Sequence, residues 1–378
     1  MLKKVTFSLI VFLFTLILCD ALLRFTDAGI YYYNTNAGYN IRRFPWIPKC
    51  YRYVTNVNMR SGVIGDLSWV SGDHTRQKEV TFITDSKGFR NTEELPSYER
   101  ILLSDSFGVS TLTDQPDILS EKMRAYGVPT YNISIDAANI WNEAVTFKYE
   151  IDNIPVKEGG IVEWVVFEGN DFEGRYFPEW PLDTVQNSWT KALGASLQNY
   201  LKNSVIRHII KSATHSYKQK NSPQENKKQD VVTKMKMFEQ PIFFDKSYVN
   251  TLALSEKDLT EHPNAKEITR CFKFLMAECQ KRNLKLRCIV APTKGRVYEW
   301  VIKGQEPWTS SLDTSPFANF FNNLCSENNI DFIDLTPTLI SESKTTYQNS
   351  GDMLYWYNDT HWNDLAQDIV AKKLVNRP

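Results

Sequence analysis

The stretch GIVEWVVFEGND, residues 160–171, combines β-branched and aromatic residues and ends in small and polar ones. Its hydrophobic residues occupy consecutive positions rather than alternate ones, as is typical of a strand that is buried on both faces. Strands of this kind belong to parallel sheets that are covered by helices on each side. The stretch therefore predicts an α/β domain with a parallel sheet.

On both sides of this stretch, strand-like and helix-like patterns alternate. The predicted strands are 99–105, 129–136, 160–171, 284–294 and 330–337, and the predicted helices are 117–127, 139–154, 265–283, 315–329 and 364–375. Asn363 is a suitable N-cap for the last helix. Five strands that alternate with helices predict a flavodoxin-like three-layer α/β/α fold with a five-stranded parallel sheet.

Two regions depart from the alternation. Residues 173–258 form an insertion with a helical stretch at 189–213 and a polar tract at 215–230, whose composition predicts a solvated, disordered loop. Residues 26–95 read as an irregular, partly β segment, with a short strand predicted at 79–91. We expect the catalytic domain to span residues 96–378.

The N-terminus has the pattern of an export signal. Lys3 and Lys4 precede an apolar run from Val5 to Leu23 that only Asp20 interrupts. A run of roughly 20 apolar residues can span a bilayer, and positive residues before it are retained in the cytoplasm. Residues 1–25 are therefore predicted to be an uncleaved signal anchor, with a cleaved signal peptide as the alternative. Both interpretations place the body of the protein outside the cytoplasm.

The composition excludes several classes of function. The 378 residues include 44 basic and 44 acidic side chains, so the net charge of +0 gives no reason to expect nucleic acid as a partner. The sequence has no glycine-rich phosphate loop, and its six cysteines and five histidines show no metal-ligand spacing. No metal or nucleotide cofactor is predicted. The aromatic content of 13% suits either sugar binding or core packing.

Polar residues follow the predicted strands where ligands bind in such sheets, at the carboxyl ends. Ser106 follows the first strand, Ala137 the second and Asn170 the third, and Asp359 and His361 precede the last helix. Each has an ordinary alternative: a turn serine or helix cap, a turn asparagine, or a capped surface histidine. Together they predict a nucleophile, Ser106, and a base, His361, whose tautomer Asp359 fixes.

The ordered segments DSF, GND and DTHWN resemble the SGNH (GDSL-like) hydrolase superfamily. The Asp-x-His-Trp pattern is similar to that of the alginate O-acetyltransferase (AlgX- and AlgJ-like) group, and SKGFRN, YNISIDAAN, FEGNDF, APTKGRVY and IDLTP support this over roughly residues 84–374. The resemblance implies an oxyanion hole made of the main-chain N–H groups of Ser106 and Ala137 and the side-chain amide of Asn170. It also suggests Trp362 and Gly169 as substrate contacts.

The sequence departs from the family pattern at two glycines. Ser104 replaces the glycine before Asp-Ser, and Ala137 replaces the glycine of the second block. Alanine retains the N–H but restricts φ, so we expect the Ala137 donor to survive if its backbone avoids positive φ. The order of the segments also differs from that in the alginate enzymes, because here the Asp-x-His pattern follows the serine.

The resemblance implies acetyl transfer to hydroxyls of an extracytoplasmic polysaccharide through an acyl-Ser106 intermediate. An SGNH esterase that acts on a carbohydrate or another small ester is the first alternative, and a non-catalytic binding or assembly protein of an envelope polysaccharide pathway is the second. The partners to be expected are the polysaccharide or acyl ester and a membrane-bound acyltransferase that supplies acetyl groups. The predicted location is the inner membrane, with a single crossing and a periplasmic domain.

Overall fold

The computed structural model describes residues 2–23, 42–43, 52–53, 55–71, 77–172, 206, 232–237, 240–245, 248, 252, 254–302 and 315–377. The chain divides into two compact units. The first unit comprises Met1–Val54 and Gln186–Lys227, and the second comprises Thr55–Val185 and Lys228–Pro378. Except for residue 206, the helical stretch and the polar tract predicted at 189–213 and 215–230 lie outside the described residues.

The first unit begins with a helix where the anchor was predicted. Helix α1 spans Leu2–Leu23. Within the part of the chain that the structure describes, no helix is both long and apolar enough to cross a membrane. Two short strands of this unit, β1 (Arg42–Arg43) and β2 (Arg52–Tyr53), pair antiparallel.

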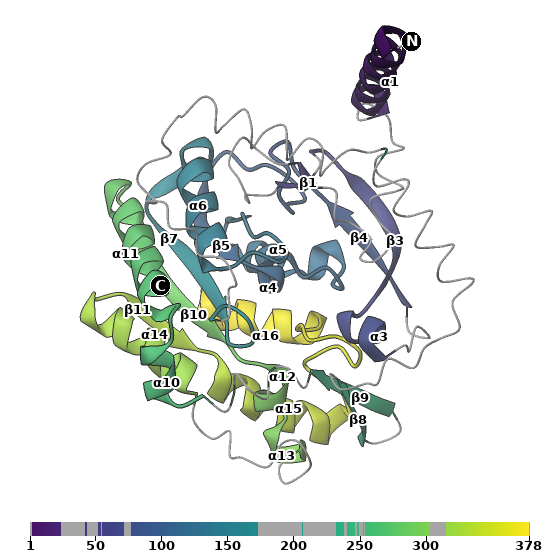
Figure 1. Cartoon of the computed structure of the whole chain (residues 1–378). Coiled ribbons are helices and arrows are strands. Elements are labelled where there is room, and N and C mark those ends of the chain that lie inside the picture. Colours follow the sequence, from purple (N-terminus) through teal and green to yellow (C-terminus); the bar gives the residue numbers. More distant parts are fainter. Residues whose placement is uncertain are drawn as a thin grey trace. The chain divides into compact units, whose positions relative to one another are not determined.

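The second unit contains the predicted five-stranded parallel sheet (Figure 1). Its strands are β5 (Tyr98–Ser104), β6 (Thr130–Asn132), β7 (Val156–Phe167), β10 (Lys285–Ala291) and β11 (Asp331–Asp334). They lie in the order β11-β10-β7-β5-β6, with parallel pairing throughout. Counted along the chain this is the order 2-1-3-4-5 of flavodoxin-like sheets, which confirms the predicted topology.

Helices cover both faces of the sheet, which explains the consecutive hydrophobic residues of β7. On one face lie α6 (Ile140–Glu150), α11 (Ala265–Lys281) and α14 (Pro316–Glu327), and the Trp164 ring lies 6.0 Å from Phe272 and 6.1 Å from Phe321. On the other face lie α5 (Leu119–Ala125), α15 (Thr336–Ser350) and α16 (Asp364–Val375), which share a core with Val165. Adjacent residues of a strand face opposite sides, so both must be apolar here.

The last helix begins where the sequence predicted. The Asn363 side chain accepts hydrogen bonds from the main-chain N–H groups of Leu365 and Ala366, each at 3.1 Å. These two N–H groups have no partner within the helix, so the cap satisfies them. Asn363 is therefore confirmed as the N-cap of α16.

Several elements were not predicted. The segment before the sheet forms an antiparallel pair, β3 (Asn58–Ile64) and β4 (Gln77–Ile83), together with α3 (Asp66–Ser71). The strand predicted at 79–91 thus ends earlier, at Ile83. The insertion contributes a second antiparallel pair, β8 (Val232–Met237) and β9 (Gln240–Asp245). Short helices complete the unit: α4 (Ser106–Val109), α10 (Glu256–Glu261), α12 (Lys294–Val297), α13 (Glu299–Ile302), and 3₁₀ turns at Gln115–Asp117 and Ile151–Asn153.

The buried side chain of Arg90 joins strand β4 to α4 and the residues that follow it. The Arg90 guanidinium donates hydrogen bonds to the carbonyl oxygens of Thr81 in β4, Val109 at the end of α4, and Ser110 and Thr113 beyond it. Arginine has five donors in a fixed planar fork, so one side chain can hold several backbone segments together. The N-terminal strands are therefore an integral part of the second unit.

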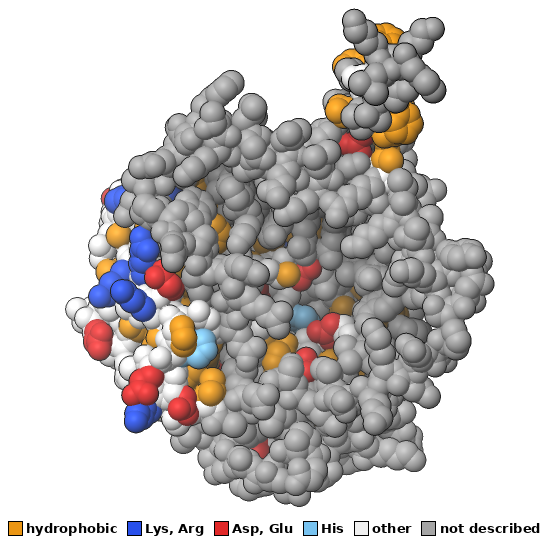
Figure 2. Space-filling model, viewed as in Figure 1, with side chains coloured by type: hydrophobic (Ala, Val, Ile, Leu, Met, Phe, Trp, Pro, Cys, Tyr) orange, Lys and Arg blue, Asp and Glu red, His pale blue; other side chains and the backbone are white. Residues whose placement is uncertain are grey.

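Charged side chains on the visible helices are of mixed sign. Figure 2 shows acidic and basic groups interspersed over the described surface near α10 and α11. They include pairs one helical turn apart, Lys257–Glu261 at 3.8 Å and Arg270–Glu267 at 3.7 Å. Exposed pairs of this kind contribute little stability but keep the local charge balanced.

Candidate active site

Ser106 lies at the turn between β5 and α4, at the carboxyl edge of the sheet. Asp105 caps the short helix, because its carboxylate accepts a hydrogen bond of 2.9 Å from the Phe107 N–H. The turn leaves Ser106 with 9% of its surface exposed. Ser106 follows β5, and the strand order of the sheet reverses between β5 and its neighbour β7, which is where ligands bind in such folds.

Asp359 and His361 lie in a closed loop between α15 and α16. A bridge between Tyr355 and Trp362 closes the loop, and the Trp356 N–H donates to the His361 carbonyl at 3.2 Å. Inside it, Asp359 Oδ1 accepts hydrogen bonds from the His361 main-chain N–H at 2.8 Å and from His361 Nδ1 at 2.5 Å. The carboxylate therefore fixes the imidazole through both the backbone and the ring.

The structure brings the serine and the histidine together. His361 Nε2 lies 2.7 Å from Ser106 Oγ, across 255 positions of sequence. In the neutral imidazole, Nδ1–H donates a hydrogen bond to Asp359 Oδ1, and Nε2 is left to accept the serine proton. A hydroxyl, an imidazole and a carboxylate in this order can activate the hydroxyl as a nucleophile.

The buried side chain of Lys294 binds the backbone of the loop that contains Asp359 and His361. Lys294 follows β10, is 3% exposed, and donates from Nζ to the carbonyl oxygens of Trp356 at 2.6 Å, Tyr357 at 3.1 Å and Asp359 at 3.1 Å. Its ammonium has three donors, and these three bonds match that number. The sequence contained a usable signal for this residue, because Lys294 is the last residue of the predicted strand 284–294.

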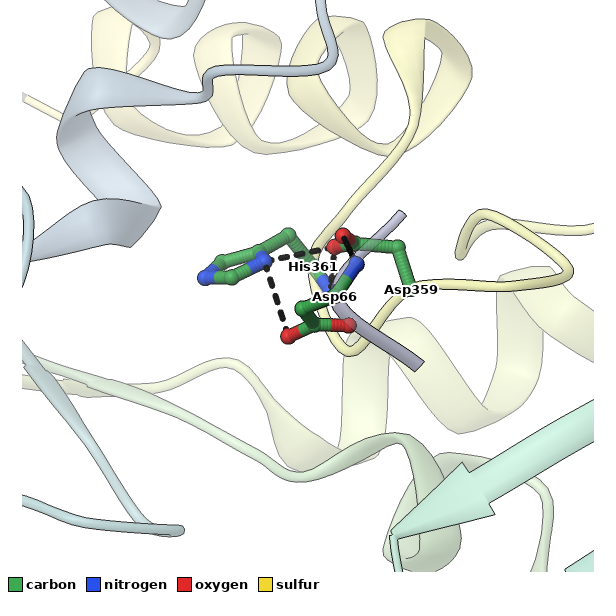
Figure 3. A group of neighbouring side chains, drawn as sticks. All are labelled: Asp66, Asp359 and His361. Atoms are coloured by element: carbon green, nitrogen blue, oxygen red, sulfur yellow. Dashed lines mark hydrogen bonds and ion pairs between the residues drawn. The ribbon is translucent and has the colours of Figure 1, made fainter. Parts of the chain in front are cut away.

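Asp66, at the start of α3, is a further polar group of the site. Its main-chain N–H donates to Asp359 Oδ2 at 2.7 Å, and its carboxylate accepts from the Thr360 N–H at 2.9 Å and from Thr360 Oγ1 at 2.5 Å. Figure 3 shows Asp66 and Asp359 on the Nδ1 side of the His361 ring, with Nε2 pointing away from both. Sequence patterns did not indicate Asp66.

The close approach of α3 depends on the residue before Asp66. A Cβ atom at Gly65 would lie 2.0 Å from the Asn358 carbonyl oxygen. The same carbonyl accepts a hydrogen bond of 3.1 Å from the Leu67 N–H. Glycine therefore allows the start of α3 to contact the catalytic loop backbone to backbone.

The charges of the site shift the pKa values of its groups in opposite directions. Burial alone lowers the pKa of His361, but the carboxylates of Asp359, Asp66 and Asp105 outweigh it and raise this pKa to about 10. Burial opposes ionisation of Asp359, yet the His361 charge and hydrogen bonds from His361 and Asp66 lower its pKa to about 2. Although 43% of the Asp66 side chain is exposed, desolvation by the surrounding protein and the Asp359 charge raise the pKa of Asp66 to about 7, against the effects of His361 and Thr360.

The ligand atoms of Asp66, Asp359 and His361 all lie within 4.8 Å of one another, a spacing compatible with a metal ion. However, the facing atoms are already engaged. Asp359 Oδ1 is bonded to the imidazole, and Asp66 Oδ2 is bonded to Thr360. Since these atoms hydrogen bond within the loop, the group has the arrangement of a proton-transfer site.

The predicted oxyanion residues lie on neighbouring strand ends. Ala137 has a φ of 56°, so its backbone does not meet the condition under which its N–H was expected to remain an oxyanion donor. Alanine adopts this left-handed conformation at a cost of about 1–2 kcal/mol, whereas glycine adopts it freely. Ala137 and Asn170 are both exposed, in contrast to the buried residues beside them.

The two predicted substrate contacts have packing roles. Trp362 is 1% exposed, its ring centroid lies 5.0 Å from that of Phe107, and its indole N–H donates to the Tyr355 hydroxyl at 3.0 Å. A Cβ at Gly169 would lie 2.4 Å from the Phe167 ring. Trp362 therefore lies in the core against Phe107, whose ring also lies close to that of His361. The missing side chain of Gly169 leaves room for the Phe167 ring.

Tyr248 is a further aromatic residue near the site that sequence patterns did not indicate. Its ring centroid lies 5.6 Å from that of Phe167. Burial raises the pKa of Tyr248 well above its usual value, with the charges of Asp66, Asp245 and Asp105 acting in the same direction and a hydrogen bond with Thr360 opposing them. The phenol therefore remains protonated.

Residues 250–377 match the family model described as "SGNH hydrolase-like domain, acetyltransferase AlgX". The matched region includes Lys294, Asp359 and His361, whereas Ser106 and Asp66 precede it. The match confirms the resemblance to the AlgX-like SGNH group over these residues. It supports acyl transfer or ester hydrolysis as the general chemistry of the chain.

Solved structures show weaker likenesses. An acetyl xylan esterase, AlAXEase, has 13% sequence identity and a TM-score of 0.35, over 73% of this chain and 98% of that one. A protein from Bacillus subtilis has 10% identity and a TM-score of 0.38, over 80% of this chain and 67% of that one. Because these TM-scores are low, the roles of the residues rest on the geometry of this chain. No curated protein matches its sequence.

Proposed function

We propose that this chain transfers an acyl group, most simply acetyl, to hydroxyl groups of an extracytoplasmic polysaccharide through an acyl-Ser106 intermediate. The observation that carries the proposal is the distance of 2.7 Å between His361 Nε2 and Ser106 Oγ, with Asp359 on the opposite ring nitrogen. The AlgX acetyltransferase match over residues 250–377 supports acetyl as the transferred group.

The first half of the reaction forms the acyl-enzyme. Ser106 Oγ attacks the acyl carbonyl carbon while His361 Nε2 takes the serine proton, and the carbonyl electrons move to the oxygen to give a tetrahedral oxyanion. The oxyanion collapses, the bond to the leaving oxygen breaks, and the imidazolium returns the proton to that oxygen. Asp359 stabilises the imidazolium throughout.

The second half transfers the acyl group. An acceptor hydroxyl attacks the acyl-Ser106 carbonyl while His361 removes the acceptor proton, and collapse of the second oxyanion releases Ser106 with its proton restored. In both halves the main-chain N–H group of Ser106 and the side-chain amide of Asn170 donate to the oxyanion. One such donor contributes on the order of 10²–10³ in rate. With water as the acceptor, the same steps give an esterase.

The proposal includes a location and a partner. The catalytic unit works on the outer side of the cytoplasmic membrane, where the polysaccharide lies, and a membrane-bound acyltransferase supplies the acetyl groups. The N-terminal pattern of two lysines followed by an apolar run supports export. The site uses only side chains and main-chain N–H groups of the chain for each step.

The test is to trap the intermediate. We expect incubation with a chromogenic acetyl ester, followed by acid quenching and peptide mass spectrometry, to show one acetyl group on the peptide that contains Ser106. The Ser106→Ala variant should show no acetyl group and lose turnover by a factor of about 10³ or more. Unchanged turnover in Ser106→Ala would refute the mechanism.

A second measurement separates transfer from hydrolysis. With an acetylated donor and an oligosaccharide acceptor, transfer increases the mass of the oligosaccharide by that of one acetyl substituent, whereas hydrolysis releases only acetate. If neither product forms and Ser106→Ala cells retain the acetyl content of their polysaccharide, the chain acts as a non-catalytic binding protein. Ser104 and Ala137, which stand where the family pattern has glycine, are the features that would favour that outcome.

A further inference from the structure

Asp66 lies against the catalytic loop but has no role in the reaction described above. It reaches the loop from α3, and 293 positions separate it from Asp359. We propose that Asp66 is a positioning residue: it holds the Asp359–His361 loop in register with Ser106 and controls how tightly the imidazole retains its proton. This inference rests on the proposed function and deepens it.

The first part of the role is mechanical. The Asp66 main-chain N–H bonds to Asp359 Oδ2 at 2.7 Å, while His361 occupies Oδ1, so the two oxygens of one carboxylate are held from two elements. The Asp66 carboxylate also binds both donors of Thr360, the residue between Asp359 and His361. All three residues of the Asp-Thr-His turn are therefore fixed by Asp66 or by one another.

The second part of the role is electrostatic. Asp66 Oδ2 lies 3.8 Å from His361 Nδ1, in addition to Asp359 Oδ1 at 2.5 Å. Asp105 faces the imidazole from the β5–α4 turn as a third carboxyl group, and Tyr248 faces Asp66 as a neutral phenol. A negative charge at this range stabilises the imidazolium that forms when Ser106 attacks, but it also makes His361 harder to deprotonate at rest.

The position of Asp66 limits the size of the charge effect. Its side chain is 43% exposed, against 1% for Asp359, so water screens part of its field. An opposite charge at this range shifts a pKa by about 1–3 units, and we expect the lower end here. Asp359 remains the principal partner of the imidazole, and Asp66 modulates it.

The experiment uses the full chain with Asp66→Asn, which removes the charge but retains an oxygen that can accept from Thr360. Selective isotope labelling of histidine gives NMR resonances for five residues, and loss of one signal in His361→Gln identifies His361. In Asp66→Asn we expect the midpoint of the His361 titration to fall by about 1 pH unit. The rise of kcat/KM with pH should move to lower pH by the same amount.

The Asp66→Ala variant removes the Thr360 bonds as well. We expect it to show the same shift and an additional loss of kcat, on the order of 10-fold, with KM little changed, because the loop is less well aligned. The matched control is Asp352→Asn, which removes an exposed carboxylate nine positions before His361 in the sequence and should shift neither midpoint.

The outcomes distinguish this inference from the function on which it rests. If neither Asp66→Asn nor Asp66→Ala changes the His361 titration or kcat, the role of Asp66 is overturned, even if Ser106→Ala is inactive. Full turnover by Ser106→Ala overturns the proposed function, while the NMR titration still reports on Asp66. A loss of kcat in Asp66→Asn without any shift in titration would assign Asp66 to structural support alone and overturn the electrostatic part.

Discussion

The strongest prediction about the catalytic loop concerns Lys294→Met. Methionine has nearly the same length as lysine and fills the same space, but it cannot donate to the carbonyl oxygens of Trp356, Tyr357 and Asp359. The bond to the Asp359 carbonyl is fully buried, and the other two are partly buried. An unsatisfied buried carbonyl costs about 1–3 kcal/mol, so we expect the free energy of unfolding to fall by about 3 kcal/mol in total.

The same substitution should also lower the catalytic activity, mainly through kcat. The three carbonyl groups belong to the loop that contains Asp359 and His361. Loss of their hydrogen bonds to Lys294 therefore allows His361 Nε2 to move away from its contact of 2.7 Å with Ser106 Oγ. A misplacement of about 1 Å at a reacting group can lower the rate by about 10²-fold. We therefore expect kcat for the chromogenic acetyl ester to fall by about 10²-fold, with a much smaller change in KM.

Urea unfolding followed by circular dichroism gives the free energy and the m-value, and initial rates are measured where the variant remains folded. Lys273→Met, at an exposed position of α11, is the matched control and should change neither quantity. If Lys294→Met loses stability but retains full kcat, the loop does not depend on the ammonium group. If it retains both, the contacts are not those of the folded protein in solution.

Three further predictions concern backbone strain, close packing and pH. Ala137→Gly should raise the free energy of unfolding by about 0.5–1 kcal/mol without lowering kcat, because glycine adopts the φ of 56° freely; a loss of stability would contradict the strain. Gly65→Ala should destabilise the protein by about 3 kcal/mol in urea unfolding, because its Cβ would lie 2.0 Å from the Asn358 carbonyl oxygen, and a neutral effect would contradict this packing. The pKa of His361 is about 10 in the folded state, against a reference value of 6.5. Its contribution to the free energy of unfolding is therefore complete below about pH 6.5 and is lost as the pH rises towards 10. The His361→Gln variant should lack this decline in stability, and an identical decline in the variant would refute the assignment.

The local pattern determined most of the sheet. Hydrophobic runs predicted all five strands, since a strand covered on both faces needs apolar residues at successive positions, and this requirement can be read from a single segment. Strand-end polarity similarly singled out Ser106, because ligands bind at the carboxyl edge of a parallel sheet. The Asp-x-His spacing before the last helix singled out Asp359 and His361. Helix α15 was not predicted because few of its residues are apolar, and among those buried only Leu339 is a large hydrophobic one.

The layered α/β architecture and the chemical types of the candidate site can thus be inferred from local patterns, because burial and turn chemistry leave periodic signals. Folding in three dimensions was needed to bring Asp66 to His361, to bind Lys294 to three carbonyls of the catalytic loop, and to place Ala137 at a positive φ. These contacts join segments separated by 62 to 295 positions. A side chain's periodicity indicates whether it is buried, but it contains no information about which distant segment will meet it.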